Sequence, residues 1–331
     1  VARVDDRPIY GGTPADGSVM QALRAIRDSG RKAVFYPFIL MEQLSGNTRP
    51  DPWSGAARQP VMPWRGRITT SIAAGRDGSP AGTAAAAAEV ARFFGAARAG
   101  DFQRDGDSIT YAGPAEWSYR RFILHYAHLC AAAGGIDSFL IGSEMVGLTT
   151  IRAAGNGFPA VAELRRLAAA VRGTLGEAVK IGYAADWSEY FGHQPGNGDL
   201  FFHLDPLWAD ENIDFIGIDN YMPLSDWREG ETHLDASWGR IDNPAYLRAN
   251  VAGGEGYDWY YASDEDRRRQ VRSPIQDGAH GEHWVWRYKD IRNWWSHYHH
   301  ERVGGVRRAQ ATAWVPGSKP VWFTEMGCAA L

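Results

Sequence analysis

The sequence has 331 residues, of which 44% are hydrophobic, with 38 glycines and 17 prolines, which is enough for one large globular domain or two smaller ones. Lysine and arginine (35) nearly balance aspartate and glutamate (39), giving a net charge of −4, so the composition predicts no nucleic-acid partner and no affinity for an anionic membrane surface. No apolar run reaches about 18 residues, so we expect no membrane span.

The first part of the chain predicts helices separated by a long loop. Because the chain begins at Val1 without methionine, and residues 1–4 resemble the tail of a strand, we expect a piece of a longer protein. Glycine and proline then delimit apolar or periodic runs. The predicted elements are a helix at 18–29, a strand at 32–41, a loop at 42–82 (rich in Gly, Pro and Arg over 46–82), a helix at 83–99, a hairpin at 101–113 and a helix at 115–133.

The second part predicts strands that alternate with helices, which is typical of a parallel sheet. We expect one domain over 1–331 with a helical insertion at 222–318. The predicted elements are strands at 138–144, 179–185, 213–221 and 319–325, and helices at 159–175, 200–208, 243–261, 264–272 and 282–302.

Two of these strands end on a glutamate, Glu144 and Glu325. Two further strands are predicted between them, so the glutamates lie on strands n and n+3. If Glu144 ends the fourth strand of an eight-stranded barrel, Glu325 ends the seventh. The predicted fold is therefore α/β, a (β/α)8 TIM barrel whose first and eighth strands lie outside this piece.

Glutamates at the carboxyl ends of parallel strands point to hydrolytic chemistry, because barrels of this class keep their active sites at that edge. Two carboxyl groups suffice to cleave a glycosidic bond, and cleavage with retention of configuration requires them to be about 5–5.5 Å apart. It also requires one pKa raised and the other kept low.

The other polar clusters give weaker predictions. His297, His299 and His300 spread around a helix at this spacing, so we expect no metal and no cofactor; a metal-dependent hydrolase built on them is the alternative. Cys130 lies in an apolar stretch, and we expect a buried thiol rather than a bridge to Cys328.

The two glutamate segments resemble glycoside hydrolase clan A, a group of retaining (β/α)8 barrels. The resemblance implies that Glu144 is the acid/base and Glu325 the nucleophile. It also implies that Tyr221, at the end of the sixth strand, hydrogen-bonds the nucleophile. The clan has asparagine before the acid/base, where this chain has Ser143, so a different substrate or weaker catalysis is implied.

A closer resemblance covers nearly the whole chain. The segments YPFILM (36–41), PWRGRIT (63–69), RRFILHYAHLCAAAGGIDSFLIGSEM (120–145) and VWFTEMGC (321–328) resemble the TIM-barrel-like, glycoside-hydrolase-like domain of the tail-tip protein of gene transfer agents and related siphophage-like particles. This resemblance implies a virion tail or baseplate component, made in the bacterial cytoplasm. Its implied partners are other tail proteins and a cell-surface or peptidoglycan-type cell-wall glycan.

Aromatic side chains are abundant, with 14 tryptophans, and aromatic faces stack on sugar rings while the indole N–H offers a polar contact. In contrast, we expect Trp284, Trp286, Trp294 and Trp295 to pack a helix against the barrel. A catalytically inactive barrel that binds glycan or builds the tail tip is the alternative function. The predicted substrate-binding residues are Ser143, Tyr221, Trp187, Asp186, Tyr36, Asn220, Trp322, Trp53 and Trp64.

Overall fold

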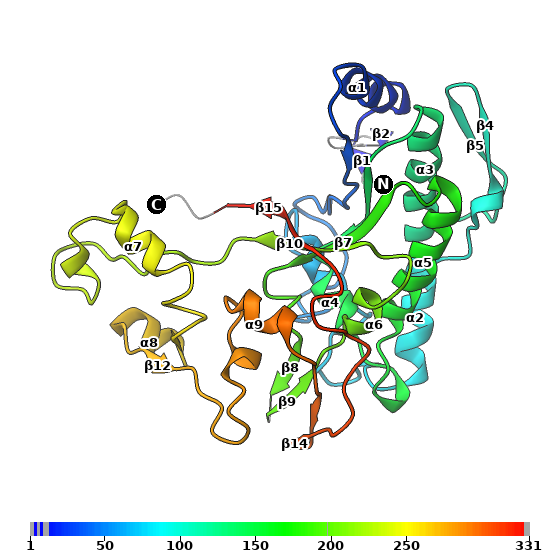
Figure 1. Ribbon diagram of the computed structural model, residues 1–331. Helices are drawn as coiled ribbons and strands as arrows, with labels where there is room; N and C mark the ends of the chain where they lie inside the picture. The colour runs from blue at the N-terminus through cyan, green and yellow to red at the C-terminus, as the bar shows by residue number, and fades with distance from the viewer. Residues whose placement is uncertain (1–2, 5–6, 9–12, 197, 328–331) are drawn as a thin grey trace. The chain divides into compact units, whose positions relative to one another are not determined.

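The computed structural model describes residues 3–4, 7–8, 13–196 and 198–327 (Figure 1). The chain forms two compact units. The first comprises the described residues up to Asp186 together with His203–Gly217 and Lys319–Trp322. The second comprises Trp187–Phe202, Ile218–Ser318 and the described residues from Phe323 onward.

A curled parallel sheet of five strands, in the order β15-β10-β7-β6-β3, organises the first unit. The last residues of β10 and β15 belong to the second unit. This order confirms that two strands lie between the Glu144 strand and the Glu325 strand, and the sheet is compatible with part of a TIM-barrel-like fold. The strands are β3 (Val34–Phe35), β6 (Ser138–Ser143), β7 (Lys180–Asp186), β10 (Phe215–Asn220) and β15 (Val321–Met326).

Local sequence signals fix the main helices of the first unit. The Thr83 and Ser118 hydroxyls accept the N–H groups of Ala85 and Arg121, which caps α2 and α3, and Pro159 begins α5. In Figure 1, α3 and α5 lie side by side. The helices are α1 (Asp16–Asp28), α2 (Ala84–Phe94), α3 (Tyr119–Ala132), α4 (Val146–Thr149), α5 (Pro159–Leu175) and α6 (Asp205–Trp208).

Several predicted elements of the first unit are shorter than expected. The strand predicted at 32–41 shrinks to β3, since Pro37 cannot donate to a ladder and the side chains of Phe38 and Leu40 are about half exposed. The helix predicted at 83–99 ends before Gly95, whose φ is +75°. The predicted hairpin is confirmed as β4 (Phe102–Asp105) and β5 (Ser108–Tyr111).

The predicted amino-terminal strand is present at Arg3–Val4, but its pairing differs from that of a barrel strand. Residues 1–2 lie outside the described part, and β1 (Arg3–Val4) pairs antiparallel with β2 (Arg7–Pro8) instead of joining the parallel sheet.

Cys130 is buried and not disulfide-bonded, as expected, whereas Cys328 lies outside the described residues. Within the described residues, no helix has the length and apolar character that a bilayer crossing requires.

The second unit contains short elements where long helices are predicted. The helix predicted at 243–261 covers only Pro244–Ala249, and the one predicted at 282–302 is replaced by two short helices and the start of a strand. The helix predicted at 200–208 is likewise replaced by β9 and α6. The elements are β8 (His193–Gly196), β9 (Asp199–Phe201), η4 (Ala236–Trp238), α7 (Pro244–Ala249), β11 (Trp259–Tyr260), α8 (Asp264–Arg269), β12 (Ser273–Pro274), η5 (His283–Trp286), α9 (Ile291–Ser296), β13 (Arg302–Val303) and β14 (Val306–Arg307).

Contacts between buried aromatic side chains, and not long helices, organise this unit. Trp294 is 1% exposed, and its ring lies 5.1 Å from that of Phe202 and 5.7 Å from that of Trp284. The buried ring of His299 stacks on Phe202 at 4.3 Å. Of the four tryptophans expected to pack a helix against the barrel, Trp284, Trp294 and Trp295 are buried and Trp286 is partly buried, but the long helix expected to carry them does not form.

The sheet has no room for a side chain at Gly182 on β7. A Cβ there would lie 2.4 Å from the ring of Phe215, which is fully buried and stacks on Trp322 at 4.0 Å. We expect Gly182→Ala to lower the free energy of unfolding by about 1–3 kcal/mol. Gly173, exposed in α5 with open space at its Cβ, is the matched control: Gly173→Ala should stabilise by about 0.5–1 kcal/mol. Urea denaturation of both variants measures the difference, and equal effects would contradict the packing argument.

Candidate active site

Glu144 occupies an unusual backbone position directly after β6. Its φ is +48°, in the left-handed region that residues other than glycine rarely adopt, and its side chain is buried, at 7% exposure. Its N–H donates to the Ala184 carbonyl of β7 at 2.8 Å, next to a register shift between β6 and β7. A strained conformation of this kind persists where the surroundings fix it, and such positions cluster at functional sites.

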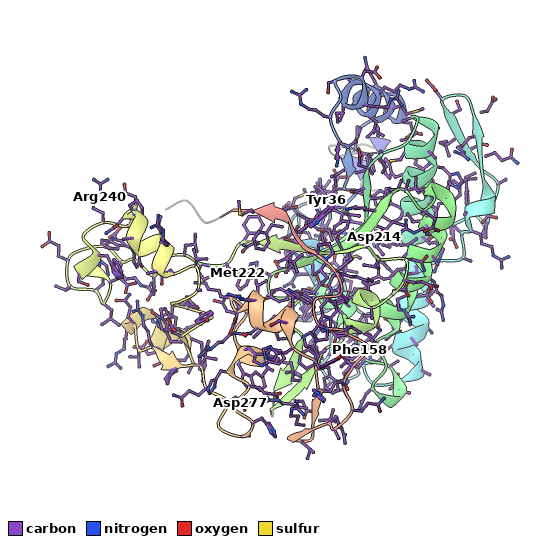
Figure 2. All side chains as sticks on the ribbon, in the orientation of Figure 1. Tyr36, Phe158, Asp214, Met222, Arg240 and Asp277 are labelled. Atoms are coloured by element: carbon purple, nitrogen blue, oxygen red, sulfur yellow. The ribbon has the colours of Figure 1, made fainter. Side chains whose placement is uncertain are left out.

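Two donors from the loop over 42–82 hold the Glu144 carboxylate. The Trp64 Nε1–H donates to Oε2 at 2.7 Å, and Arg65 Nη2 lies 2.8 Å from the same oxygen. Arg65 also donates to the Ser143 hydroxyl oxygen at 2.8 Å, and that oxygen lies 2.6 Å from the hydroxyl of Tyr36, a residue that Figure 2 labels. Charge-assisted bonds of this type are the stronger class of protein hydrogen bond.

The loop is fixed closely against the turn that follows Glu144. A Cβ at Gly147 would lie 2.5 Å from the Gly66 carbonyl oxygen, so only glycine permits this approach of α4 to η1 (Arg65–Arg67). The Trp53 Nε1–H donates to the Arg67 carbonyl at 2.8 Å, and Arg67 pairs with Asp51 at 3.1 Å. The tryptophan at 53 therefore braces the loop that presents Trp64 and Arg65.

Glu325, in the second unit, has a different environment. It lies on β15 and is partly exposed. Its Oε2 accepts a hydrogen bond from the Tyr221 hydroxyl at 2.8 Å. The adjacent Thr324 hydroxyl donates to Asp219 Oδ1 at 2.7 Å, and Asp219 is fully buried. The ends of β10 and β15 are joined further by the Gly327 N–H, which donates to the Asn220 carbonyl at 3.0 Å.

Three further predicted residues lie at strand ends or in the core. Asp186, the last residue of β7, is 7% exposed. Trp322 packs against the sheet core through Phe215. In the second unit, the ring of Trp187 lies 4.9 Å from that of Tyr288, and burial raises the pKa of that tyrosine.

Within the first unit the structure brings Tyr36, Ser143, Trp64 and Glu144 together, and within the second it brings Tyr221 to Glu325. The sequence pattern does not single out Arg65, although this residue contacts both Ser143 and Glu144. Its only signal is its place in the PWRGRIT segment. Asp219 is missed as well, and a charged residue inside an otherwise apolar strand is the signal that identifies it.

The histidines considered as metal ligands contact backbone carbonyls. His299 Nε2 lies 2.8 Å from the Trp294 oxygen, His297 Nδ1 lies 2.7 Å from the Asn293 oxygen, and His300 Nδ1 lies 3.0 Å from the Arg308 oxygen. Each of these contacts involves one nitrogen of the ring.

Comparison with known proteins identifies a family. A search of curated proteins finds none that matches the chain. A family model described as the GTA TIM-barrel-like domain matches residues 117–331, which include β6, β7, β10 and β15. The chain therefore belongs to the family of TIM-barrel-like domains of gene transfer agents.

Proposed function

We propose that this chain is a retaining glycoside hydrolase domain of a gene-transfer-agent particle, acting from the particle tail on a cell-surface or cell-wall glycan. One observation carries the proposal: Glu144, directly after β6, is a buried carboxylate in left-handed backbone. Two further features support it. Glu325 lies on β15, three strands along the same sheet, and it accepts a hydrogen bond from Tyr221.

In the proposed reaction Glu325 attacks the anomeric carbon, while Glu144 gives a proton to the departing glycosidic oxygen. The bond from the anomeric carbon to that oxygen breaks as the bond to the Glu325 carboxylate forms. Glu144 then removes a proton from water, whose oxygen displaces Glu325 from the sugar. The two inversions give net retention of configuration. The Tyr221 hydroxyl orients the nucleophile for the first attack.

A second candidate function rests on the crowding around Glu144. One carboxylate oxygen accepts from both Trp64 and Arg65, and the Ser143 hydroxyl is engaged by Tyr36 and Arg65. The Oε2 atom of Glu144 is thereby engaged by two donors, whereas a general acid must itself donate a proton. A barrel that binds glycan without cleaving it fits this arrangement, unless substrate displaces Arg65.

Product analysis separates the two functions. The chain is incubated with purified peptidoglycan and with envelope polysaccharide, and new reducing ends are measured. For any substrate cleaved, proton NMR of the first products reports the anomeric configuration. We expect reducing ends and retained configuration. Inverted products would rule out the assigned roles, and binding without release of reducing ends would favour the inactive barrel.

Tyr221→Phe tests the contact with the nucleophile. The variant keeps the ring, which packs near Gly327, and removes only the hydroxyl that donates to Glu325. Because one hydrogen bond to a charged group contributes about 1.5–3 kcal/mol, we expect kcat/KM to fall by roughly 10- to 100-fold. Steady-state kinetics measures this change, and an unchanged kcat/KM would show that Tyr221 does not assist Glu325.

A further inference from the structure

An open groove lies beside the Glu144 environment, wholly within the first unit. Its volume is about 900 Å³, within the range of small-molecule sites. We call it the aromatic groove. It lies between the segment that follows β3, the end of α2 and the start of α3, and its walls include Tyr36, Phe38, Leu40, Phe93, Trp117 and Tyr126.

The aromatic groove is connected to the Glu144 environment through Tyr36 and Phe38. The Tyr36 hydroxyl lies 2.6 Å from the Ser143 hydroxyl, and its ring lies 5.9 Å from the ring of Phe38. The guanidinium of Arg65 lies 4.7 Å from the centre of the Phe38 ring, while its Nη2 lies 2.8 Å from Glu144. Residues of the groove wall therefore contact Ser143 and Arg65, which lie next to the candidate acid/base Glu144.

Trp117 offers an unusually accessible aromatic surface in this groove. Its side chain is 92% exposed, but its orientation is constrained because the guanidinium of Arg121 lies 4.1 Å from its ring and 4.1 Å from the ring of Tyr111. Such cation–π contacts hold an exposed ring in place. Phe38 is also 48% exposed. Exposed rings that a neighbour holds in place are poised to receive a ligand.

We propose that the aromatic groove binds consecutive sugar units of a glycan, so that the protein cleaves bonds in the interior of the polymer. The cleavage part rests on the proposed function, whereas the binding part does not. Aromatic faces suit the apolar faces of sugar rings. Side chains of both charge signs, Glu42, Arg49 and Arg92, line the groove and supply acceptors and donors for hydroxyl groups. Tyr36 in the groove wall contacts Ser143, and Arg65 connects the wall residue Phe38 to Glu144, so we expect the groove and the carboxylate to contact the same molecule.

Binding is tested in the Glu325→Gln variant, in which cleavage does not consume the ligand. The probes are the β-1,4-linked hexasaccharides of glucose, N-acetylglucosamine and mannose. Their binding is measured by isothermal titration calorimetry and ligand-observed NMR. We expect at least one probe to bind, and Trp117→Ala or Phe38→Ala to weaken that binding at least 10-fold. Tyr298→Ala, which removes an aromatic ring 57% exposed in the second unit, is the matched control and should leave binding unchanged.

The outcomes separate the groove from the catalytic proposal. No binding of any probe, or binding that both groove variants leave intact, would overturn the groove proposal. A groove that binds an apolar peptide instead of a sugar would overturn it as well, in favour of a protein partner. Groove-dependent binding without hydrolysis by the unmodified chain would reject only the catalytic proposal. If both hold, Trp117→Ala should slow cleavage of a polymer more than cleavage of an aryl monosaccharide.

Discussion

Replacing Glu325 by glutamine is expected to lower the rate of glycoside hydrolysis at least about 1,000-fold, or roughly 4 kcal/mol of transition-state stabilisation. Glutamine keeps the shape of the side chain and can still accept from Tyr221, so the fold should persist. It cannot attack the anomeric carbon as a carboxylate does. The measurement is reducing-end release under conditions in which the unmodified chain is active, and full activity of this variant would refute the assignment.

Glu144→Gln should have an effect that depends on the leaving group. With a natural glycan, loss of the proton donor is expected to slow the reaction about 100- to 10,000-fold. With a dinitrophenyl glycoside, whose leaving group needs no proton, the first step should remain fast. Equal losses on both substrates would argue against an acid/base role for this residue.

Azide distinguishes the two carboxylates further. In Glu144→Ala, azide can replace water in the second step and give a glycosyl azide of retained configuration. In Glu325→Ala, azide can occupy the nucleophile's place and give the inverted product. The control is Glu265→Gln, which alters an exposed carboxylate on α8 and should leave the rate unchanged.

The parts of the fold that the sequence predicts are those with strong local signals. The helix at 159–175 matches α5 at both ends because proline begins it and glycine follows it. The strands β6, β7, β10 and β15 match because apolar runs with glycine or proline nearby have few alternatives. The prediction of a strand at 32–41 is wrong for most of its length. An apolar run alone does not ensure that each residue has a hydrogen-bonding partner on a neighbouring strand.

The Glu144 environment depends on contacts that local patterns do not encode. Arg65 reaches Glu144 from 79 positions away in the sequence, and the left-handed backbone of Glu144 arises from its surroundings because glutamate does not favour it. The long helices predicted within 222–318 are wrong for a related reason. Its tryptophans and histidines stack on one another across the sequence, so their spacing resembles a helix that does not form.

A buried ion-pair network in this segment is the basis of the second large prediction. Arg302 is 5% exposed and binds Asp277 through both terminal nitrogens, at 3.1 and 2.7 Å (Asp277 is labelled in Figure 2). It also donates to Glu282 at 3.1 Å, and Arg307 binds Glu282 through two further bonds. Removing one partner of such a pair leaves an uncompensated buried charge.

We expect Arg302→Ala to lower the free energy of unfolding of the second unit by about 3–5 kcal/mol. Guanidinium denaturation followed by tryptophan fluorescence measures this, because the buried tryptophans of the unit report its unfolding. The control is Arg268→Ala on α8, which removes an exposed pair with Glu265 and should cost only about 0–1 kcal/mol. If the two variants lost similar free energies of unfolding, the buried Arg302 network would contribute no more than an exposed ion pair.

Acid should reveal the same network through its carboxylates. Burial alone would raise the pKa values of Asp277 and Glu282, but the hydrogen bonds and charges of Arg302 and Arg307 outweigh burial and lower both pKa values. A lowered folded-state pKa contributes stability above the ordinary values of 3.8 and 4.5, and this stability is lost as the pH falls through the folded-state values. The unmodified chain should therefore lose stability steeply below about pH 4, and Arg302→Ala less steeply. Parallel stability curves for the two proteins across this pH range would contradict the assignment, because the arginine is then not what keeps these carboxylates ionised.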